Sequence, residues 1–280
     1  MKVGEQNEWK KQHQTSRRNV RRKSGFTIYE EESVVYFQQI DGDLDVLPQQ
    51  SDAPDVSVII PAYNEEETIA EVLRRMIKVS WSLGNVEIIV VDDGSSDRTR
   101  EEVTAFPLVK CFSHAVNRGK GAAVRTGIEN SHGKVVVIND ADLEYEPEYL
   151  PMLVKPILDG SSDIVYGSRF KGDTDGMSFS HYVGNSVLSL MARFLYSREI
   201  TDIMTGQKAF RRSILDGAKL REDGFAVEVE MTCAGLNAGR RFKEVPIPYL
   251  YRRHGYSKIA NMDGVRSFIK LITLFLTTNG

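Results

Sequence analysis

The alternation of short apolar runs with helical segments, which begins at Val56, constrains the fold of this chain more than any other feature. Val56–Ile60 is a β-branched run that stops at Pro61, and it predicts a buried strand. From Thr68 to Ser80 the apolar residues have helical spacing. Further strands are expected at Val86–Val91, Val109–Phe112, Val135–Asn139 and Ile164–Tyr166, and further helices at Gly121–Asn130 and Glu146–Leu158. We therefore predict an α/β domain with a mostly parallel sheet flanked by helices.

Polar residues follow four of the expected strands, at the point where each strand ends. These clusters are Tyr63–Glu65, Asp92–Ser95, Asp140–Asp142 and Gly167–Arg169. In open parallel sheets, ligands bind outside the carboxyl ends of the strands. The four clusters therefore predict one binding site along a single edge of the sheet.

The chain has 280 residues, 41% of them hydrophobic, which is enough for one large domain with a substantial core. Its net charge of −3 argues against a nucleic-acid-binding protein. Residues 1–23 are basic, with eight Lys and Arg against two Glu. We expect residues 1–55 to form a basic, largely disordered arm and linker, either solvated or in contact with anionic lipid. The catalytic domain is expected over 56–260, and an apolar helix over 261–280.

Cysteine content and hydropathy suggest a cytoplasmic protein. Cys111 and Cys233 are the two cysteines, and no CxxC pair is present, which fits a reducing compartment. The N-terminus lacks the apolar core of a signal peptide, and no stretch reaches the length that spans a bilayer. The longest apolar run, Phe268–Leu276, belongs to the C-terminal helix. That helix could lie in a membrane interface or pack on the catalytic domain.

Asp140 and Asp142 are the strongest candidates for a metal site. Residues i and i+2 of an extended segment point the same way, so both carboxylates face one site. Oxygen ligands without His or Cys suit Mg²⁺ or Mn²⁺, which bridge carboxylates and substrate phosphates. The pair could instead cap a helix.

The other strand-end clusters each have a functional and an ordinary interpretation. Asp92–Ser95 could accept hydrogen bonds from a base or ribose, or form a common turn. Pro61–Glu65 offers an aromatic face and polar groups, or a loop that caps a helix. Asn117–Gly121 places two cations and two glycines before a helix, as a phosphate-facing turn would, but it lacks the spacing of a P-loop.

Taken in order, these segments resemble the inverting glycosyltransferases of family 2, which have the GT-A fold. Within that family the chain is most similar to dolichol-phosphate mannose synthases and their bacterial polyprenyl-phosphate relatives. The resemblance runs from about Val56 to the C-terminus. Its motifs are Val58–Glu65, Val90–Ser95, Asn117–Gly121, Asp140–Glu144, Tyr166–Phe170, Thr205–Arg212, Glu228–Glu230, Glu244–Pro248 and Tyr256–Ile259.

The resemblance implies roles for individual residues. The nucleotide sugar would be held by Pro61, Tyr63, Glu65, Val91, Asp93 and Lys120, together with Asp140, Ala141 and Asp142. Asp140 and Asp142 would bind the metal, with Glu144 as a third ligand where related synthases often have Gln. The acceptor phosphate would be bound by Arg169, His181, Arg212 and Lys258, and catalysis would depend on Asp142, Arg169 and Arg212.

Two positions depart from the family pattern. Met177 and His181 stand where some synthases have an Arg and a Ser before an Asn like Asn185. A bacterial subgroup with His at this place resembles the chain more closely. His181 could donate to the acceptor phosphate, or it could be a structural histidine.

We therefore expect metal-dependent, inverting transfer of a hexose to polyprenyl or dolichyl phosphate at the cytoplasmic face of a membrane. The donor would be GDP-mannose or, as the second choice, UDP-glucose, and a membrane subunit is a possible partner. A phosphate acceptor needs no base because it is already anionic near neutral pH. Alternatively, the acceptor is a hydroxyl group and Glu228 or Glu230 is the base. A nucleotide-binding regulator and a nucleotidyltransferase fit the motifs less well.

Overall fold

A computed structural model describes residues 19–23, 26–31, 34–39, 54–79, 81, 84–174, 176–251 and 261–279. The chain divides into two compact units, Met1–Ala53 and Pro54–Gly280. In the first unit, β1 (Asn19–Lys23), β2 (Phe26–Glu31) and β3 (Val34–Gln39) form an antiparallel sheet in that order. Part of the stretch that we expected to be disordered therefore contains strands. Apart from Pro54 and Asp55, the rest of the expected arm and linker, residues 1–18, 24–25, 32–33 and 40–53, lies outside the described residues.

The second unit is built on a seven-stranded sheet with the order β10-β8-β9-β7-β4-β5-β6. All neighbouring strands in it are parallel except β9, which runs antiparallel to both β7 and β8. The mostly parallel sheet predicted from the sequence is thereby confirmed. The strands are β4 (Val56–Ala62), β5 (Val86–Asp92), β6 (Val109–Ser113), β7 (Val135–Asn139), β8 (Ile164–Asp173), β9 (Gln207–Arg211) and β10 (Phe242–Pro248).

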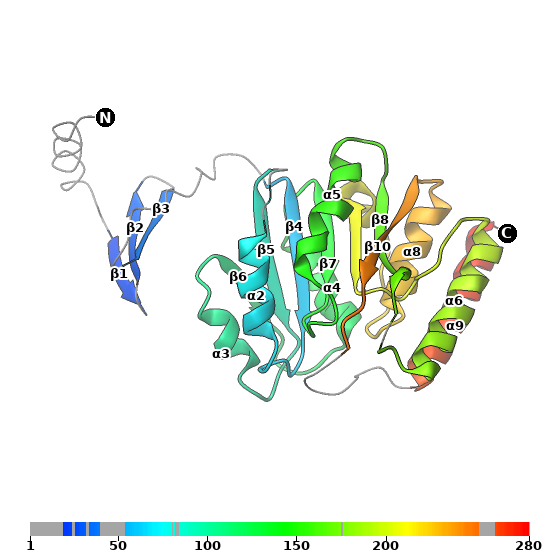
Figure 1. The fold of residues 1–280 in the computed structure, drawn as a ribbon, viewed down its shortest axis with the longest axis horizontal. Coiled ribbons are helices and arrows are strands. Elements are labelled where there is room, and N and C mark those ends of the chain that lie inside the picture. The colour runs from blue at the N-terminus through cyan, green and yellow to red at the C-terminus, as the bar shows by residue number, and fades with distance from the viewer. Residues whose placement is uncertain are drawn as a thin grey trace. The chain divides into compact units, whose positions relative to one another are not determined.

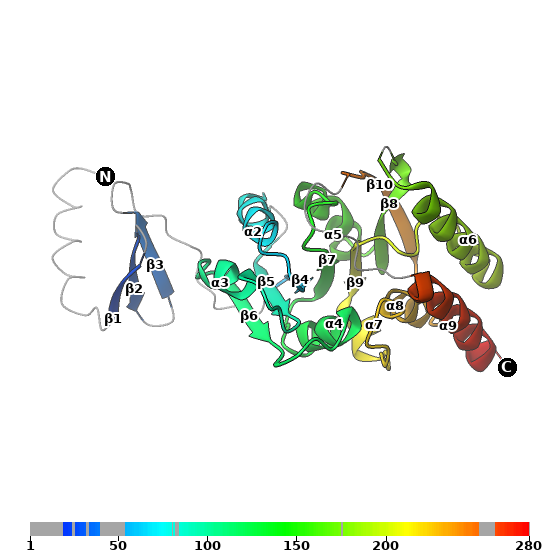
Figure 2. The same cartoon turned by 90° about the horizontal axis from the view of Figure 1, so that it is seen from below.

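Helices cover both faces of this sheet (Figure 1). One face carries α2 (Ile69–Lys78), α3 (Thr99–Thr104), the 3₁₀ turn η1 (Pro147–Tyr149) and α5 (Leu150–Leu158). The other face carries α4 (Lys120–Glu129), α7 (Arg212–Asp216) and α8 (Val227–Asn237). Figure 2 shows the two layers of helices on opposite sides of the strands.

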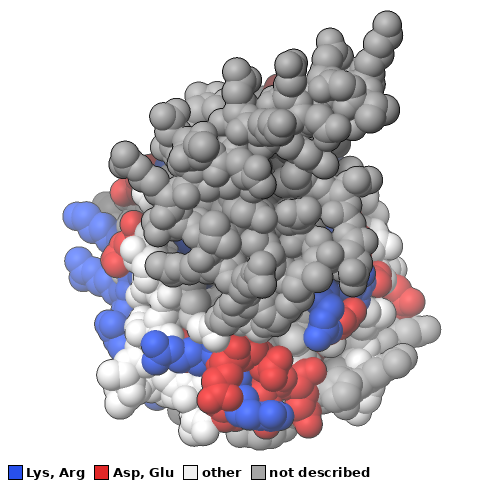
Figure 3. Space-filling view, turned by 90° about the vertical axis from the view of Figure 1, so that its left-hand side faces the viewer, with Lys and Arg blue, Asp and Glu red and all other residues white. Residues whose placement is uncertain are grey.

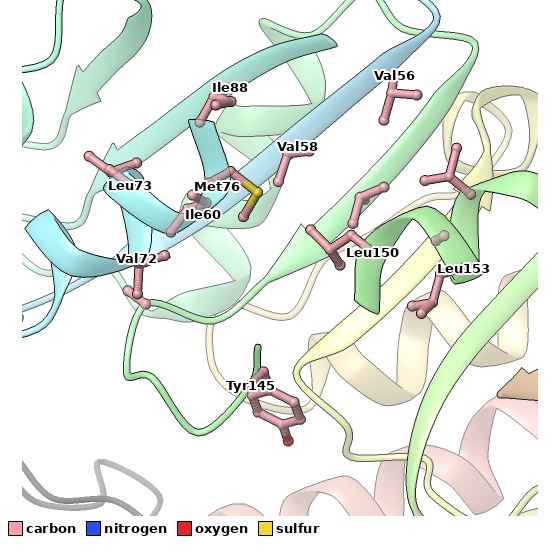
Figure 4. Close-up of a cluster of buried hydrophobic side chains, with 14 of the residues drawn as sticks. Val56, Val58, Ile60, Val72, Leu73, Met76, Ile88, Tyr145, Leu150 and Leu153 are labelled. Atoms are coloured by element: carbon pink, nitrogen blue, oxygen red, sulfur yellow. The ribbon is translucent and has the colours of Figure 1, made fainter. Parts of the chain in front are cut away.

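Alternation along β4 explains why both faces are apolar. Val58 and Ile60 pack with Leu73 of α2 in one buried cluster, whereas Ile59 between them packs in the cluster on the opposite face. Figure 4 shows the first cluster, in which side chains from α2 and α5 meet those of β4. Because the strands pack against helices on both faces of the sheet, the end of each strand is held in position relative to the neighbouring strands.

Two further helices lie at the β10 end of the sheet. α6 (Phe179–Tyr196) and α9 (Asn261–Asn279) pack with α8 in a third apolar cluster, in which Leu188 and Leu271 are buried. The C-terminal helix therefore packs on the domain, but its Ile269 remains 58% exposed. Within the described part of the chain, no helix combines the length and apolarity needed to cross a bilayer.

Surface charges of both signs are interspersed, as one face of the molecule shows (Figure 3). On α2, Arg74 pairs with Glu71 at 2.8 Å, and both side chains are about half exposed. Exposed pairs of this kind contribute little to stability. The buried clusters, rather than surface ion pairs, therefore hold the strands in place.

Neighbouring residues of α2 provide a test of this conclusion. We expect Leu73→Ala, which empties a fully buried position, to lower the free energy of unfolding by about 3 kcal/mol. Arg74→Ala removes only the exposed pair and should change that free energy by less than about 0.5 kcal/mol. Urea unfolding followed by circular dichroism measures both, and equal losses would contradict the assignment of α2 to the core.

Candidate functional site

A cavity of about 630 Å³ opens beside the carboxyl ends of β4, β5, β7 and β8. It brings together most of the residues that the sequence placed at this edge of the sheet. Its walls include Pro61, Tyr63, Glu65, Asp93, Lys120, Asp140, Ala141, Asp142, Glu144, Arg169 and His181. Val91 does not line the cavity, because it is buried in β5 and packs with Ala123 of α4.

The loops after β4 and β5 are tied to each other. The backbone N–H of Asn64 donates to Ser95 Oγ at 2.9 Å, and the Asn64 side chain accepts from the backbone of Ser96. Asn64 has a positive φ of 48°, a conformation that Asn tolerates better than most residues. Glu65 is buried and accepts a hydrogen bond from Thr68 Oγ1 at 2.9 Å. The first two strand-end clusters thus form one structural unit.

Asp93 shapes the loop that precedes α4. One of its carboxylate oxygens lies 2.6 Å from His114 Nδ1 and accepts from the backbone of Arg118. The other oxygen accepts from the backbone of Gly119 at 2.7 Å. Gly119 has a φ of 99°, which favours glycine. Through these bonds Asp93 positions the loop that leads into α4. No sequence pattern pointed to His114 as its partner.

A chain of buried charges crosses the floor of the cavity. The Lys120 ammonium lies 2.6 Å from Asp140 Oδ1 and 2.7 Å from Glu228 Oε1. Glu228 also pairs with Lys208 of β9, whose side chain is fully buried. Two ammonium groups and two carboxylates therefore alternate across α4, the end of β7, α8 and β9. Reasoning from the sequence did not single out Lys208, because β9 has three polar or charged residues among its five and gave no strand signal.

Burial and pairing act against each other on these groups. Burial favours a lower pKa for Lys120, but Asp140 and Glu228 outweigh it and hold that pKa above its ordinary value. Burial favours a higher pKa for Glu228, yet the two lysines keep it below the usual range. For Lys208 burial dominates, and its pKa is lowered despite the pairing with Glu228.

Asp140 and Asp142 are the residues that could hold a divalent metal ion. Asp142 is buried, and its Oδ1 accepts from the backbone of Glu144 at 3.1 Å. A side chain at position 206 would collide with Asp140 Oδ2, so Gly206 leaves room for that carboxylate. In the part of the chain that the structure describes, no three His, Cys, Asp or Glu converge as metal ligands. A metal at this pair would therefore need oxygens from a substrate phosphate as well.

Arg169 lines the cavity in a rigid setting. Its Nε and Nη2 donate to the two carboxylate oxygens of Asp202, each at 2.7 Å. The guanidinium also lies over the rings of Tyr145 and Tyr249. Burial acts to lower the pKa of Arg169, but the Asp202 carboxylate holds that pKa above its ordinary value. The bidentate pairing leaves Nη1 as the nitrogen not used by Asp202.

One expected phosphate-binding residue, Arg212, is not brought to the cavity. Arg212 follows β9, which runs antiparallel to β7, and so it lies at the opposite edge of the sheet. There its guanidinium donates to Gly133 O and to Ser131 Oγ. This position does not fit the catalytic and acceptor roles expected for Arg212. Lys258 lies outside the described residues.

The N-terminal part of α6 forms the remaining wall. Ser178 caps this helix by accepting from the backbone of His181 at 3.4 Å. The cavity is also lined by Met177 and His181, which depart from the family pattern, and by Asn185, which matches it. The structure therefore brings the expected acceptor-side residues Arg169 and His181 to the same cavity as the metal pair.

Comparison with known proteins agrees with this geometry. The model of "Glycosyl transferase family 2" matches residues 57–217, more than half of the chain. The chain belongs to glycosyltransferase family 2. Its matched region runs from β4 to β9 and includes the ends of β4, β5 and β7, which border the cavity.

Individual relatives of this family 2 chain share most of its length. A dolichol-phosphate mannosyltransferase of Pyrococcus furiosus is 35% identical over 73% of the chain and 59% of its own length. A UDP-N-acetylglucosamine–dolichyl-phosphate N-acetylglucosaminyltransferase of Methanococcus voltae is 29% identical over 78% of the chain and 95% of its own length.

A solved structure of glucosyl-3-phosphoglycerate synthase from Mycobacterium tuberculosis has the same fold. It superposes with a TM-score of 0.63 at 22% identity, over 81% of this chain and 79% of that one. That protein was crystallised with Mn²⁺, UDP and phosphoglyceric acid. The likeness supports the GT-A assignment of the sheet and helices.

The buried pair Lys208–Glu228 is open to a double-mutant cycle. We expect Lys208→Met to lower the free energy of unfolding by about 3 kcal/mol, because it removes one partner of a buried ion pair. In the double variant with Glu228→Gln the loss should be smaller than the sum of the single losses by at least about 1 kcal/mol. Urea unfolding of all four proteins gives the coupling, and additive losses would contradict a direct interaction.

Proposed function

We propose that this family 2 glycosyltransferase transfers a hexose from a nucleoside diphosphate sugar to a polyprenyl phosphate, using Mg²⁺ or Mn²⁺. GDP-mannose is the favoured donor and UDP-glucose the second choice. One observation carries the choice of acceptor. Helix α6 lines the cavity with one side and exposes a continuous apolar face on another.

The exposed face of α6 consists of large apolar side chains at helical spacing. Phe179 is 83% exposed and Phe194 is 80% exposed, with further apolar residues between them on the same helix: Tyr182, Val183, Val187 and Leu190. Surfaces of this kind mark sites of contact with membranes or other partners. A polyprenyl phosphate combines a phosphate head with an apolar chain, and α6 offers a cavity wall for the first and an apolar face for the second.

At the donor end, Asp140 and Asp142 would hold the metal together with the diphosphate. The bound metal would neutralise the charge that develops on the departing nucleoside diphosphate. Lys120, at the start of α4, pairs with the Asp140 carboxylate and would add positive charge beside the diphosphate. Tyr63 and Glu65 border the cavity on the β4 side, where the nucleoside would lie.

At the acceptor end, Arg169 and His181 would bind the phosphate. The bidentate bond to Asp202 holds the guanidinium still, so its position does not have to be fixed when the acceptor arrives. A phosphate oxygen carries its own negative charge and attacks the sugar without losing a proton to the protein. The reaction therefore requires positioning groups but no catalytic base.

Glu228 and Glu230, the two candidate bases for a hydroxyl acceptor, form ion pairs with lysines. Glu228 pairs with both Lys120 and Lys208, and its lowered pKa makes it a poor proton acceptor. Glu230 accepts from two backbone N–H groups and pairs with Lys270 of α9, and it does not line the cavity. These contacts favour a phosphate acceptor over a hydroxyl acceptor.

The names of the relatives support the same class of acceptor. Two of them carry dolichol or dolichyl phosphate in their names, one with mannose and one with N-acetylglucosamine. We infer a position at the cytoplasmic face of a membrane, with α6 turned toward the lipid and a membrane subunit as a possible partner. Residues 1–55 would act as an arm and linker, and the catalytic domain would extend over 56–260, with the C-terminal helix α9 packed on it.

Transfer of a labelled sugar tests the proposal. The protein is incubated with Mn²⁺, a C55 polyprenyl phosphate and labelled GDP-mannose or UDP-glucose. Label should enter organic solvent and be released by mild acid, and EDTA should prevent the transfer. Asp142→Asn should lower the rate at least about a hundredfold. Asp159→Asn, on the exposed end of α5, is the matched control and should leave it unchanged. Label confined to a water-soluble glycan would refute the proposed acceptor.

The exposed face of α6 generates a separate prediction. Replacing Phe179 and Phe194 together by Ser should weaken binding to phosphatidylglycerol vesicles at least about tenfold, because each buried Phe contributes about 1.5–3 kcal/mol. Transfer to the C55 acceptor should fall, while transfer to a short, water-soluble prenyl phosphate should not. Met152→Ser, at a half-exposed position of α5, is the control. Unchanged vesicle binding in the double variant would exclude α6 as the lipid-facing surface.

A further inference from the structure

The Lys120 side chain is bound to the same carboxylate that the metal requires. Its ammonium lies 2.6 Å from Asp140 Oδ1, and only 11% of the side chain is exposed. Glu228, 2.7 Å away on the other side, keeps the ammonium inside the cavity wall. Lys120 therefore cannot move fully into solvent without breaking both ion pairs.

A divalent ion coordinated by Asp140 would approach within about 2.1 Å of its oxygens. The ammonium and the metal would then share one carboxylate and repel each other at a separation of a few ångströms, where the cavity wall leaves only 11% of the Lys120 side chain and 21% of the Asp140 side chain exposed to water. The four charges of Lys120, Lys208, Asp140 and Glu228 already cancel, and Asp142 adds one negative charge. A metal alone would leave this buried group with a net positive charge.

A diphosphate changes this balance. Its negative charges could interact with both the metal and the Lys120 ammonium and would offset their positive charges. We propose that Lys120 is a positioning residue that couples the two ligands: it competes with the divalent ion for Asp140, and the donor diphosphate relieves that competition. The inference rests on the donor half of the proposed function, a metal-bound nucleoside diphosphate, and is independent of the acceptor.

The arrangement around Lys120 allows the exchange that this coupling needs. An ammonium has three donors, so Lys120 can keep its bond to Glu228 while it turns from Asp140 toward a phosphate oxygen. Lys208 holds Glu228 on the far side, which fixes the point about which Lys120 turns. By thermodynamic linkage, the diphosphate then strengthens metal binding by the same factor as the metal strengthens diphosphate binding.

Titration with MnCl₂, followed by electron paramagnetic resonance, tests the coupling without any acceptor or turnover. In the unaltered protein we expect GDP or UDP to tighten Mn²⁺ binding at least about tenfold. In Lys120→Met, Mn²⁺ should bind without nucleotide at least about tenfold more tightly than it binds the unaltered protein. The additional gain from nucleotide should then be smaller. A residue with a purely structural role would give the opposite sign, because damage to the site weakens metal binding.

Three further variants make the result decisive. Lys120→Arg keeps the charge and should retain weak binding of Mn²⁺ alone. Lys110→Met removes an exposed lysine that pairs with Glu87 on β5, away from the cavity, and should not alter Mn²⁺ binding. If Lys120→Met does not fold, Lys120→Gln keeps a donor without the charge and is interpreted in the same way.

The outcomes separate this inference from the proposed function. Mn²⁺ affinity without nucleotide that is unchanged or weaker in both neutral variants overturns the coupling. Loss of transfer to polyprenyl phosphate, with the Mn²⁺ and nucleotide coupling intact, overturns the acceptor but supports the role of Lys120. If the unaltered protein binds no Mn²⁺ with either nucleotide, both the metal role and the coupling are refuted.

Discussion

The site depends on the buried charges that join Lys120, Asp140, Glu228 and Lys208. Isolated charges are costly to bury, and each of these is retained because a partner of opposite sign lies against it. The four groups come from α4, the end of β7, α8 and β9, which are distant in sequence. The contacts that offset the cost of burial therefore also hold α4 and the end of β7 at a fixed distance from α8 and β9.

A second rigid pair, Arg169 and Asp202, performs the corresponding task at the end of the cavity where the acceptor is proposed to bind. Asp202 holds Arg169 through two side-chain bonds and also accepts from the Arg169 backbone. Between the two charge clusters lies Gly206, whose lack of a side chain leaves space for the Asp140 carboxylate. The cavity thus has fixed charges at both ends, which suits the proposed transfer of a sugar from one phosphate-bearing substrate to another.

Local sequence was sufficient to predict most strands of the sheet. The run Val135–Asn139 was expected as a strand and is β7 at the same bounds, because its apolar residues are buried on both faces. The expected strand Ile164–Tyr166 is the start of the longer β8, whose last residues are exposed and polar and gave no strand signal. β9 was not predicted, because Gln207, Lys208 and Arg211 interrupt its apolar pattern, and its place in the sheet rests on pairing with residues about 40 to 75 positions away.

The same long-range pairing decided which site residues were predictable. Asp140 and Asp142 follow the parallel strand β7, and Arg169 lies just beyond the predicted part of β8, so their place at one edge followed from the alternation of strands and helices. Arg212 follows a strand of opposite direction, which the local pattern does not reveal, and it lies at the other edge. Partners such as Asp202 and Lys208 come from tertiary contacts alone. Spacing within a single segment carries no information about them.

The direction of β9 also has a consequence for synthesis of the chain. When the ribosome has produced the chain as far as β7, four parallel strands can associate, but the outer side of β7 is an unpaired edge. That edge stays open until residues 207–211 emerge, about 70 residues later, because β9 is the strand that pairs with it. β8 cannot replace it, since β8 joins the sheet through β9. The nascent domain is therefore most prone to misassembly during this interval, and a chaperone that shields strand edges would act on it then.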